Sequence, residues 1–287
     1  MPSRIGGKSM KMKNIMSSPV YVVEPDETVA RARNLMMKYK VGSILVVDDP
    51  MILGIFTKSD LNMKLFAEEA AWKRRPIDQI PIKSVMTTDV VTLSPNVSAS
   101  EAAKLMVEKN IDHIPVFEKE VIGIVSKTDM IKYAAETAVE GRVGDAMTGK
   151  AVTVNTSHTL NHVIDEMKKS DVQKVIVMDN NEKAVGIVSV KDLSASELID
   201  ADGKRSIKEA KKSSSKAARY ALDVPFIAED IMTNIVAADV SESIASAAKK
   251  IIDNNVVSLP VTKNGKVSGM ISKNDILKWL AENGSQE

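Results

Sequence analysis

The sequence predicts an α+β fold in which four copies of a strand–helix–strand–strand–helix (βαββα) unit are packed in pairs as two modules. Two recurring anchors predict it. Each copy opens with Met and a small hydroxyl residue, and each closes with an apolar–Gly–apolar–apolar–Ser/Thr–x–x–Asp segment. The Met and the Gly are 37 to 39 residues apart in every copy, which indicates an internal repeat. The openings are Met16-Ser17, Met86-Thr87, Met147-Thr148 and Met232-Thr233, and the closing segments end at Asp60, Asp129, Asp192 and Asp275.

Composition excludes several functional classes. The net charge of +1 over 287 residues argues against bulk electrostatic capture of nucleic acid. The chain has no cysteine, which removes disulfides, thiolate metal sites and a cysteine nucleophile and fits a reducing compartment. Its apolar runs are far shorter than the ~18 residues that a membrane span needs, and the basic segment 1–13 lacks the apolar core of a secretory signal. We therefore expect a cytoplasmic protein.

Repeat 2 shows the order of elements most clearly. Residues 90–93 are a short β-rich run that stops at Ser94-Pro95. Residues 98–101 open a helix whose apolar positions recur at intervals of three and four, and Asn110 ends it. Two strands are expected at residues 114–117 and 121–125; the second is apolar throughout and is expected to be covered on both faces. A final helix starts at residues 126–129.

The other repeats follow the same order. Helices are expected at residues 29–39, 160–169 and 244–253, and strand pairs at residues 43–47 and 53–57, 175–178 and 185–189, and 259–261 and 267–272. Three strands and two short helices leave one sheet face uncovered, so we expect repeat 1 to pack on repeat 2 and repeat 3 on repeat 4.

These patterns divide the chain into seven segments. We expect an N-terminal tail at residues 1–12, repeats at residues 13–68, 83–138, 139–196 and 228–282, and connectors at residues 69–82 and 197–227. The first connector region is expected to contain a helix through Phe66 and Trp72. The second, rich in Lys and Ser, is either an exposed connector or a docking segment for a partner or an anionic surface.

The closing segments allow two interpretations. A Ser or Thr followed three residues later by an acid is a helix N-cap signature and needs no ligand. The same geometry places unpaired N–H groups and the positive end of a helix dipole where a phosphate could bind, and a carboxylate where it could accept from a ribose diol. The glycine that comes before allows close backbone approach or tight packing.

The Met-Ser/Thr opening, the helix, the apolar strand pair and the Gly-containing close together resemble the CBS (cystathionine β-synthase) domain. Four copies, from about residue 13 to residue 280, resemble two Bateman modules in tandem, as in the γ subunit of AMP-activated protein kinase and stand-alone archaeal CBS proteins. The resemblance implies a regulatory protein that binds AMP, ADP, ATP or S-adenosylmethionine in clefts between paired repeats.

Carried over by position, the resemblance implies a set of site residues. The ribose would be held by Asp60, Asp129, Asp192 and Asp275, and the ribose or phosphate by Thr57, Ser126, Ser189 and Ser272. The adenine would lie near Val20, Val91, Val152 and Val236. The residues before the second strand, namely Ser43, His113, Lys174 and Ser258, would face the phosphates, which makes His113 and Lys174 the candidate phosphate contacts. Lys58, Lys127 and Lys273 form a second basic set, or are solvated lysines at a helix start.

Enzyme motifs are not found. The sequence contains no Gly-x-x-x-x-Gly-Lys-Ser/Thr loop and no Gly-x-Ser-x-Gly elbow. His158 and His162 have the spacing of metal ligands but lack the acid of a zincin motif, so we expect no metal site and no cofactor besides the regulatory ligand. We expect no membrane partner and an unidentified regulated protein, and the two modules either form one disc within a chain or assemble into a homodimer. The alternatives are an S-adenosylmethionine module, or an interaction module with empty clefts, among which nucleic-acid binding ranks low because aromatics are scarce.

Overall fold

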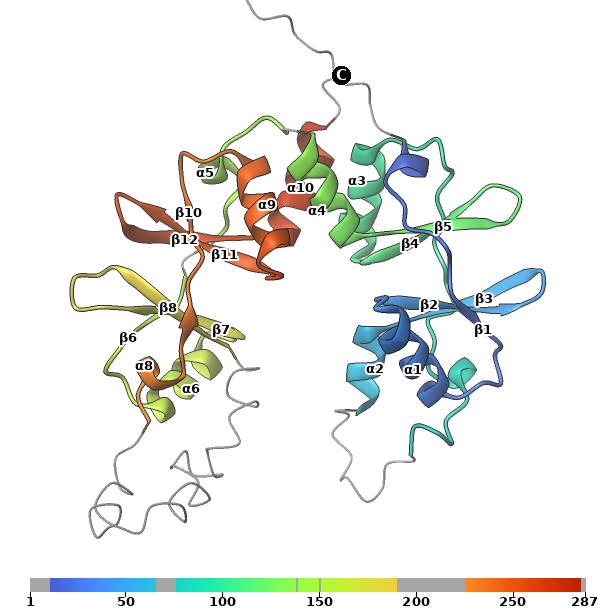
Figure 1. Ribbon diagram of the computed structural model, residues 1–287, viewed down its shortest axis with the longest axis horizontal. Coiled ribbons are helices and arrows are strands. Elements are labelled where there is room, and N and C mark those ends of the chain that lie inside the picture. The colour runs from blue at the N-terminus through green and yellow to red at the C-terminus, as the bar shows by residue number, and fades with distance from the viewer. Residues whose placement is uncertain (1–10, 66–75, 138, 150, 190–225, 285–287) are drawn as a thin grey trace, which may run out of the picture. The chain divides into compact units, whose positions relative to one another are not determined.

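The structure is a computed structural model that describes residues 11–65, 76–137, 139–149, 151–189 and 226–284. Its contacts group the chain into two compact units (Figure 1). Unit 1 comprises residues 1–137 with 277–287, and unit 2 comprises residues 138–276. Repeats 1 and 2 therefore lie in unit 1, and repeat 3 with most of repeat 4 lies in unit 2. The expected connector helix at Phe66 and Trp72, and most of the Lys/Ser-rich segment, fall outside the described residues.

Repeat 1 has the expected βαββα order. Its elements are β1 (Val22–Val23), α1 (Val29–Tyr39), β2 (Ser43–Asp48), β3 (Met51–Thr57) and α2 (Lys58–Leu65). The strands form a sheet of order β1-β2-β3, in which β1 runs parallel to β2 and β2 antiparallel to β3.

The other repeats keep this plan. Repeat 2 has α3 (Ala99–Lys109), β4 (His113–Phe117), β5 (Val121–Ser126) and α4 (Lys127–Glu136). Repeat 3 has β6 (Thr153–Asn155), α6 (Leu160–Lys169), β7 (Lys174–Met178) and β8 (Ala184–Ser189). Repeat 4 adds β9 (Thr233–Asn234) to the sheet of repeat 3, and then has β10 (Ala238–Asp239), α9 (Ile244–Asp253), β11 (Ser258–Lys263), β12 (Lys266–Ser272) and α10 (Lys273–Asn283).

The first long helix of each repeat begins at a hydroxyl cap. In each of these four helices the cap side chain accepts a hydrogen bond from the backbone N–H three residues later, which satisfies one of the unpaired donors of the first turn. The caps are Thr28, Ser98, Thr159 and Ser243. Ser98 forms a full capping box with Glu101, and α3 ends at Asn110 in the left-handed conformation (φ 51°), as the sequence predicts.

Two expectations for repeat 2 are wrong. Residues 90–93 form no strand and make only one parallel bridge, between Leu93 and Val116. In repeat 1 the backbone N–H of Leu45 donates to the first strand, but Pro115 occupies the equivalent position in β4 and has no N–H to give. The strand β5 is also not covered on both faces, because buried and half-buried residues alternate along it.

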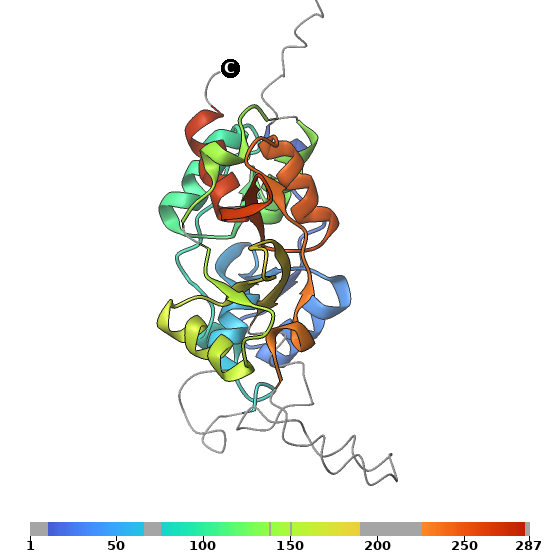
Figure 2. The ribbon, with the colours of Figure 1, turned by 90° about the vertical axis from the view of Figure 1, so that its left-hand side faces the viewer.

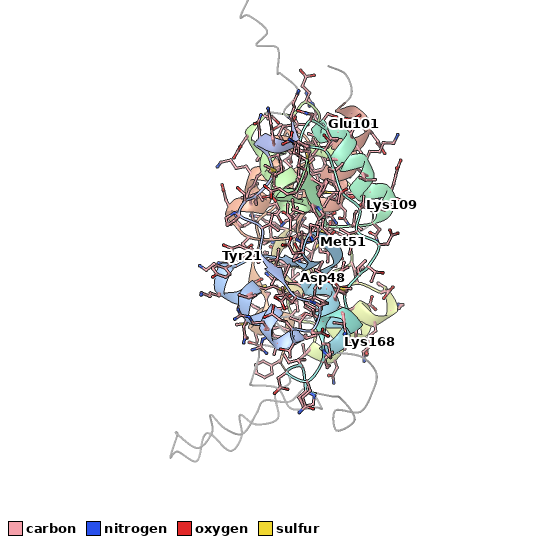
Figure 3. All side chains as sticks on the ribbon, turned by 90° about the vertical axis from the view of Figure 1, so that its right-hand side faces the viewer. Tyr21, Asp48, Met51, Glu101, Lys109 and Lys168 are labelled. Carbon is pink, nitrogen blue, oxygen red and sulfur yellow. The ribbon has the colours of Figure 1, made fainter. Side chains whose placement is uncertain are left out.

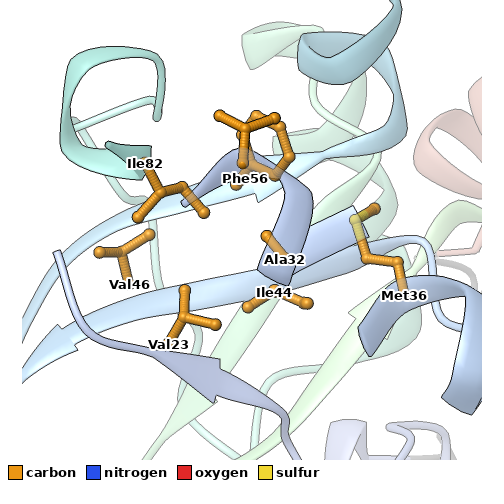
Figure 4. Packing of buried hydrophobic residues seen from close by; sticks show 8 residues of the cluster. Val23, Ala32, Met36, Ile44, Val46, Phe56 and Ile82 are labelled. Atoms are coloured by element: carbon orange, nitrogen blue, oxygen red, sulfur yellow. The ribbon is translucent and has the colours of Figure 1, made fainter. Parts of the chain in front are cut away.

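Within each unit the sheets of the two repeats face each other, and the helices cover the outer faces (Figures 1 and 2). A short turn that precedes each repeat crosses to the partner. Ile82, in η3 (Ile82–Ser84), is fully buried in the core of repeat 1 (Figure 4), and the Met12 N–H of η1 (Met12–Asn14) donates to Val97 of repeat 2.

Unit 2 has the same exchange. Ala228, in α8 (Ala228–Ile231), is part of the core of repeat 3, and α5 (Val143–Ala146) packs on α9 and β10 of repeat 4. Each repeat in a pair therefore completes the core of its partner, which explains why the repeats occur in pairs.

Candidate functional site

The Ser/Thr-x-x-Asp segments form helix caps in every copy that the structure describes. In repeat 1 the Thr57 N–H donates to Asp60 Oδ2 at 2.8 Å, and the Asp60 N–H donates to Thr57 Oγ1 at 3.3 Å. The same reciprocal bonds join two further pairs, Ser126 with Asp129 and Ser272 with Asp275. In repeat 3, Ser189 is described but Asp192 lies outside the described residues. The capping interpretation therefore holds for these three pairs. A ligand at these segments would have to bind groups that the cap hydrogen bonds do not use.

In repeats 2 and 4 the second carboxylate oxygen is tied to the partner repeat. The hydroxyl of Ser17 donates to Asp129 Oδ1 at 3.2 Å, and the hydroxyl of Thr148 donates to Asp275 Oδ1 at 3.0 Å. Both carboxylates are buried, with 9% and 6% of their residue surface exposed. In the part of the chain that the structure describes, no hydroxyl of repeat 2 bonds Asp60 in this way. Each of these two aspartates therefore links the first anchor of one repeat to the second anchor of its partner.

The repeated glycines give space to the repeated methionines. A methyl group added to Gly54 would lie 2.5 Å from Met86 Sδ, which is far inside van der Waals contact. Gly123 meets Met16 and Gly186 meets Met232 in the same way. Backbone hydrogen bonds flank these contacts, with the Ser17 N–H donating to Ile124 at 2.8 Å in unit 1. The glycine therefore serves close packing between paired repeats, one of the two roles that the sequence left open.

A pocket of about 190 Å³ lies between repeats 3 and 4 of unit 2. It brings together four predicted site residues: Lys174, Ser189, Val236 and Ser258. Its remaining lining includes Thr233 and Asn234, from the opening of repeat 4, and the apolar residues Ile187, Ile235, Val256, Leu259 and Pro260. Asn234 could not be predicted as a site residue, because it follows the Met-Thr anchor and belongs to no repeated pattern. A cation, hydroxyls and apolar walls thus converge in one cleft.

In unit 1, His113 occupies the position that Ser258 has in unit 2, because each begins the second strand in the second repeat of its unit and pairs with the serine of the closing motif. Its ring lies against Gly42, where an added methyl group would be 2.6 Å from Nε2. Burial lowers the pKa of His113, while the carboxylates of Asp112 and Asp129 act against that shift. The Nδ1 atom of His113 is buried and has no hydrogen-bond partner among the described residues.

Strand register changes one residue of the predicted adenine set. The backbone oxygens of Tyr21 and Val152 accept equivalent bonds from the second strands of repeats 1 and 3, so Tyr21, and not Val20, matches Val152. Tyr21 stacks on Tyr39 of α1 with ring centroids 4.1 Å apart, and its place beside the repeat-1 helix is seen in Figure 3. Val91 is half-buried, at a position where β4 has no matching strand.

The second basic set does not behave uniformly. The ammonium group of Lys127 forms an ion pair with Asp112 and is only 17% exposed, so it is not a solvated lysine. Lys58 is exposed and Lys273 is half-buried. Because Lys58 and Lys127 both act on the charge of His113, they lie near the candidate phosphate position of unit 1.

Two further features of unit 2 bring polar side chains together. A pocket of about 350 Å³ lies where the hairpins of repeats 3 and 4 meet, and the Glu182–Lys266 ion pair forms part of its wall. The rings of His158 and His162 pack edge to face, and His158 Nδ1 accepts from the Asn155 N–H. No cluster of three or more metal-ligating side chains occurs among the described residues.

None of the helices in the described ranges has the length and apolar character to cross a membrane.

Comparison with known proteins finds this architecture in other solved structures. Solved structures with the same fold include an uncharacterized conserved protein from Pyrococcus horikoshii (TM-score 0.62, 20% identity). Another is protein MJ1225 from Methanocaldococcus jannaschii, described as a proposed archaeal homolog of g-AMPK (TM-score 0.60, 20% identity). Each match covers 94% of this chain and 100% of the other chain.

Sequence relatives agree with this placement. MJ1225 is 22% identical over 285 residues, which is 94% of this chain and 98% of that protein. Uncharacterized protein MJ1404 of the same organism is 32% identical over 138 residues, a match that spans 45% of this chain but only 33% of MJ1404. The CBS domain matches the sequence four times, at residues 12–66, 82–136, 143–197 and 228–282. The chain therefore belongs to the CBS domain family and carries four CBS domains in two pairs.

Proposed function

We propose that the chain is a regulatory protein that binds an adenosine nucleotide (AMP, ADP or ATP) between paired repeats and passes the change in packing to a partner protein. The observation that carries the proposal is the pocket between repeats 3 and 4, where Lys174, Ser189 and Ser258 face apolar walls. Small-molecule sites combine apolar walls with a few well-placed polar groups in this way.

The base and the phosphate of a nucleotide each have a chemical match in this pocket. The aliphatic side chains of Ile187, Ile235 and Val236 suit a purine. The ammonium group of Lys174 suits a phosphate, since a charged donor forms a strong hydrogen bond to an anion. We assign the ribose diol to Asp192, three residues after Ser189, and by the same rule to Asp60, Asp129 and Asp275 in the other repeats.

The pocket volume supports a switching role. About 190 Å³ is smaller than the roughly 300–1,000 Å³ of typical small-molecule sites. A nucleotide would therefore enter as repeats 3 and 4 shift apart, and it would stabilise the shifted arrangement by its higher affinity for that state. The Met–Gly contacts and the Thr148–Asp275 hydrogen bond join the same two repeats, so these contacts would change when repeats 3 and 4 shift.

S-adenosylmethionine is the second candidate ligand. It has no phosphate, so Lys174 in unit 2 and His113 in unit 1 favour a nucleotide. The description of MJ1225 as a proposed homolog of g-AMPK agrees with a sensor rather than an enzyme. A cytoplasmic location, a regulated protein partner and a homodimeric assembly complete the proposal.

A thermal-shift panel with AMP, ADP, ATP and S-adenosylmethionine tests it. A ligand at 100 times its dissociation constant adds about 2.7 kcal/mol per site, and each kcal/mol raises the midpoint by roughly 2–4 °C at this size. The shift should shrink in Asp192→Asn or Asp60→Asn, each measured against the same variant without ligand because the Asp60 carboxylate also caps a helix. An equal shift in all four Asp→Asn variants, or no shift with any nucleotide, contradicts the proposal.

A further inference from the structure

The two pairs of repeats differ in the first residues of their second strands. In unit 2 these residues are Lys174 and Ser258, and both line one pocket. In unit 1 they are Ser43 and His113, which pair with the closing-motif residues in the same register. Each pair thus has one basic side chain and one serine at these positions. The base is a permanently charged ammonium group in one pair and an imidazole in the other.

The surroundings of His113 leave one of its nitrogens without a partner. The ring packs on Gly42 of repeat 1, at a place where no other residue type would leave room for it. Its Nδ1 atom is buried and makes no hydrogen bond within the described ranges. Buried polar atoms in folded proteins nearly always have a partner, so an unpaired one needs an explanation. A bound group that completes the hydrogen bonding of the ring supplies one.

Four charged groups surround this imidazole. Asp112 comes immediately before β4, and Asp129 and Lys127 belong to the first turn of α4. Lys58, at the start of α2 of the partner repeat, opposes protonation of the ring by its charge. Asp112 is already held in an ion pair by Lys127, and Asp129 is held by its helix cap and by Ser17. Burial outweighs the carboxylates and lowers the pKa of His113, so the free protein holds the ring neutral at pH 7.

A phosphate group would reverse this balance. A dianion beside the ring favours imidazolium over imidazole, because opposite charges close together stabilise the charged form. We propose that a nucleotide bound between repeats 1 and 2 takes up a proton at His113, so that this pair responds to nucleotide and pH together, whereas the Lys174 pair binds without proton uptake. This inference rests on the proposed function. Between the free and the bound pKa of the ring, affinity at the first pair then falls about tenfold per pH unit as pH rises.

The small number of histidines makes a direct test possible. The chain has three, and His113→Gln identifies the His113 resonance in a proton NMR spectrum. The pH titration of all three imidazoles is recorded on the full chain alone, with saturating AMP and with adenosine. AMP should raise the pKa of His113 by one unit or more. Adenosine, which lacks the phosphate, should not raise it.

Calorimetry in two buffers of different ionisation enthalpy provides an independent readout. AMP binding to the wild-type chain should take up protons, and AMP binding to His113→Gln should not. Lys174→Ala should keep the proton uptake while losing AMP binding between repeats 3 and 4. If AMP binds but the His113 titration does not move, or if uptake persists in His113→Gln, the inference is wrong and the proposed function stands. If AMP, ADP and ATP all fail to bind, both are overturned.

Discussion

The hydroxyl of Ser17 donates a hydrogen bond to Asp129 across 112 residues of sequence, and Thr148 repeats the contact with Asp275 in unit 2. The first residue of each pair belongs to the opening anchor of a repeat, and the second to the closing anchor of its partner. The sequence pattern thus records contacts between repeats as well as structure within them. Any ligand that engages these aspartates also acts on the interface of the pair.

Gly123→Ala should destabilise unit 1 by about 1–3 kcal/mol, as overpacking does. The added methyl group would collide with the side chain of Met16. We would measure the free energy of unfolding of Gly123→Ala, Met16→Ala and the double variant. These values give the coupling free energy between the two residues. We expect the double variant to be more stable than the sum of the single changes predicts. Strict additivity would show that the two residues do not contact each other.

Ser17→Ala should cost about 0.5–1.5 kcal/mol, the net value of one hydrogen bond, because Asp129 Oδ1 loses its cross-repeat donor. Ser17→Thr should be tolerated, since threonine stands at this position in the other three repeats. The exposed neighbour Ser18 supplies the matched control, Ser18→Ala. Equal unfolding midpoints for Ser17→Ala and Ser18→Ala would contradict the assigned bond.

The stability of the ligand-free protein should depend on His113 below neutral pH. Burial lowers the pKa of His113 in the folded state below the ordinary value of about 6.5 that the unfolded chain retains. Between these two values the unfolded state binds more protons, so the free energy of unfolding falls as pH drops, by at most about 1.4 kcal/mol per pH unit. Above pH ~6.5 the contribution is constant.

Unfolding experiments between pH 7.5 and 5.5 test this dependence. His113→Gln should flatten the pH dependence relative to wild type, while the exposed-site variant Ser18→Ala should leave it as in wild type. A steeper loss of stability in His113→Gln would mean that the folded protein holds a protonated ring.

Lys174→Ala should weaken nucleotide binding in unit 2 by tenfold or more, because a hydrogen bond to a charged group contributes about 1.5–3 kcal/mol. Lys168→Ala, an exposed lysine on α6 labelled in Figure 3, removes the same charge away from the pocket and should leave affinity unchanged. Binding of adenosine should be equally strong in both variants. Equal losses for Lys168→Ala and Lys174→Ala would assign the effect to net charge.

Local structure followed from the sequence where a residue type has one strong preference. The cap at Ser98, the helix end at Asn110 and the strand pairs could be predicted because each depends on near neighbours. The burial of Ile82 in the partner core could not, since nothing in its sequence context distinguishes a turn that packs on its own repeat from one that crosses over.

Site residues were harder to predict because their positions depend on strand register and on packing between repeats. Lys174, Ser189, Val236 and Ser258 meet in one pocket as expected, but Tyr21 replaces Val20 only when strand register is known. The bond from Ser17 to Asp129, and the lack of its counterpart at Asp60 within the described residues, depend on how two sheets pack, which spacing along the chain does not encode.

The most direct test is calorimetric titration of AMP into the full chain after bound ligand has been removed. Saturable binding, weakened in Lys174→Ala and unchanged in Lys168→Ala, is the predicted result and establishes a nucleotide site between repeats 3 and 4. The absence of binding by AMP, ADP and ATP, in protein confirmed to be folded, would contradict the account and leave the Ser/Thr-x-x-Asp segments as helix caps alone.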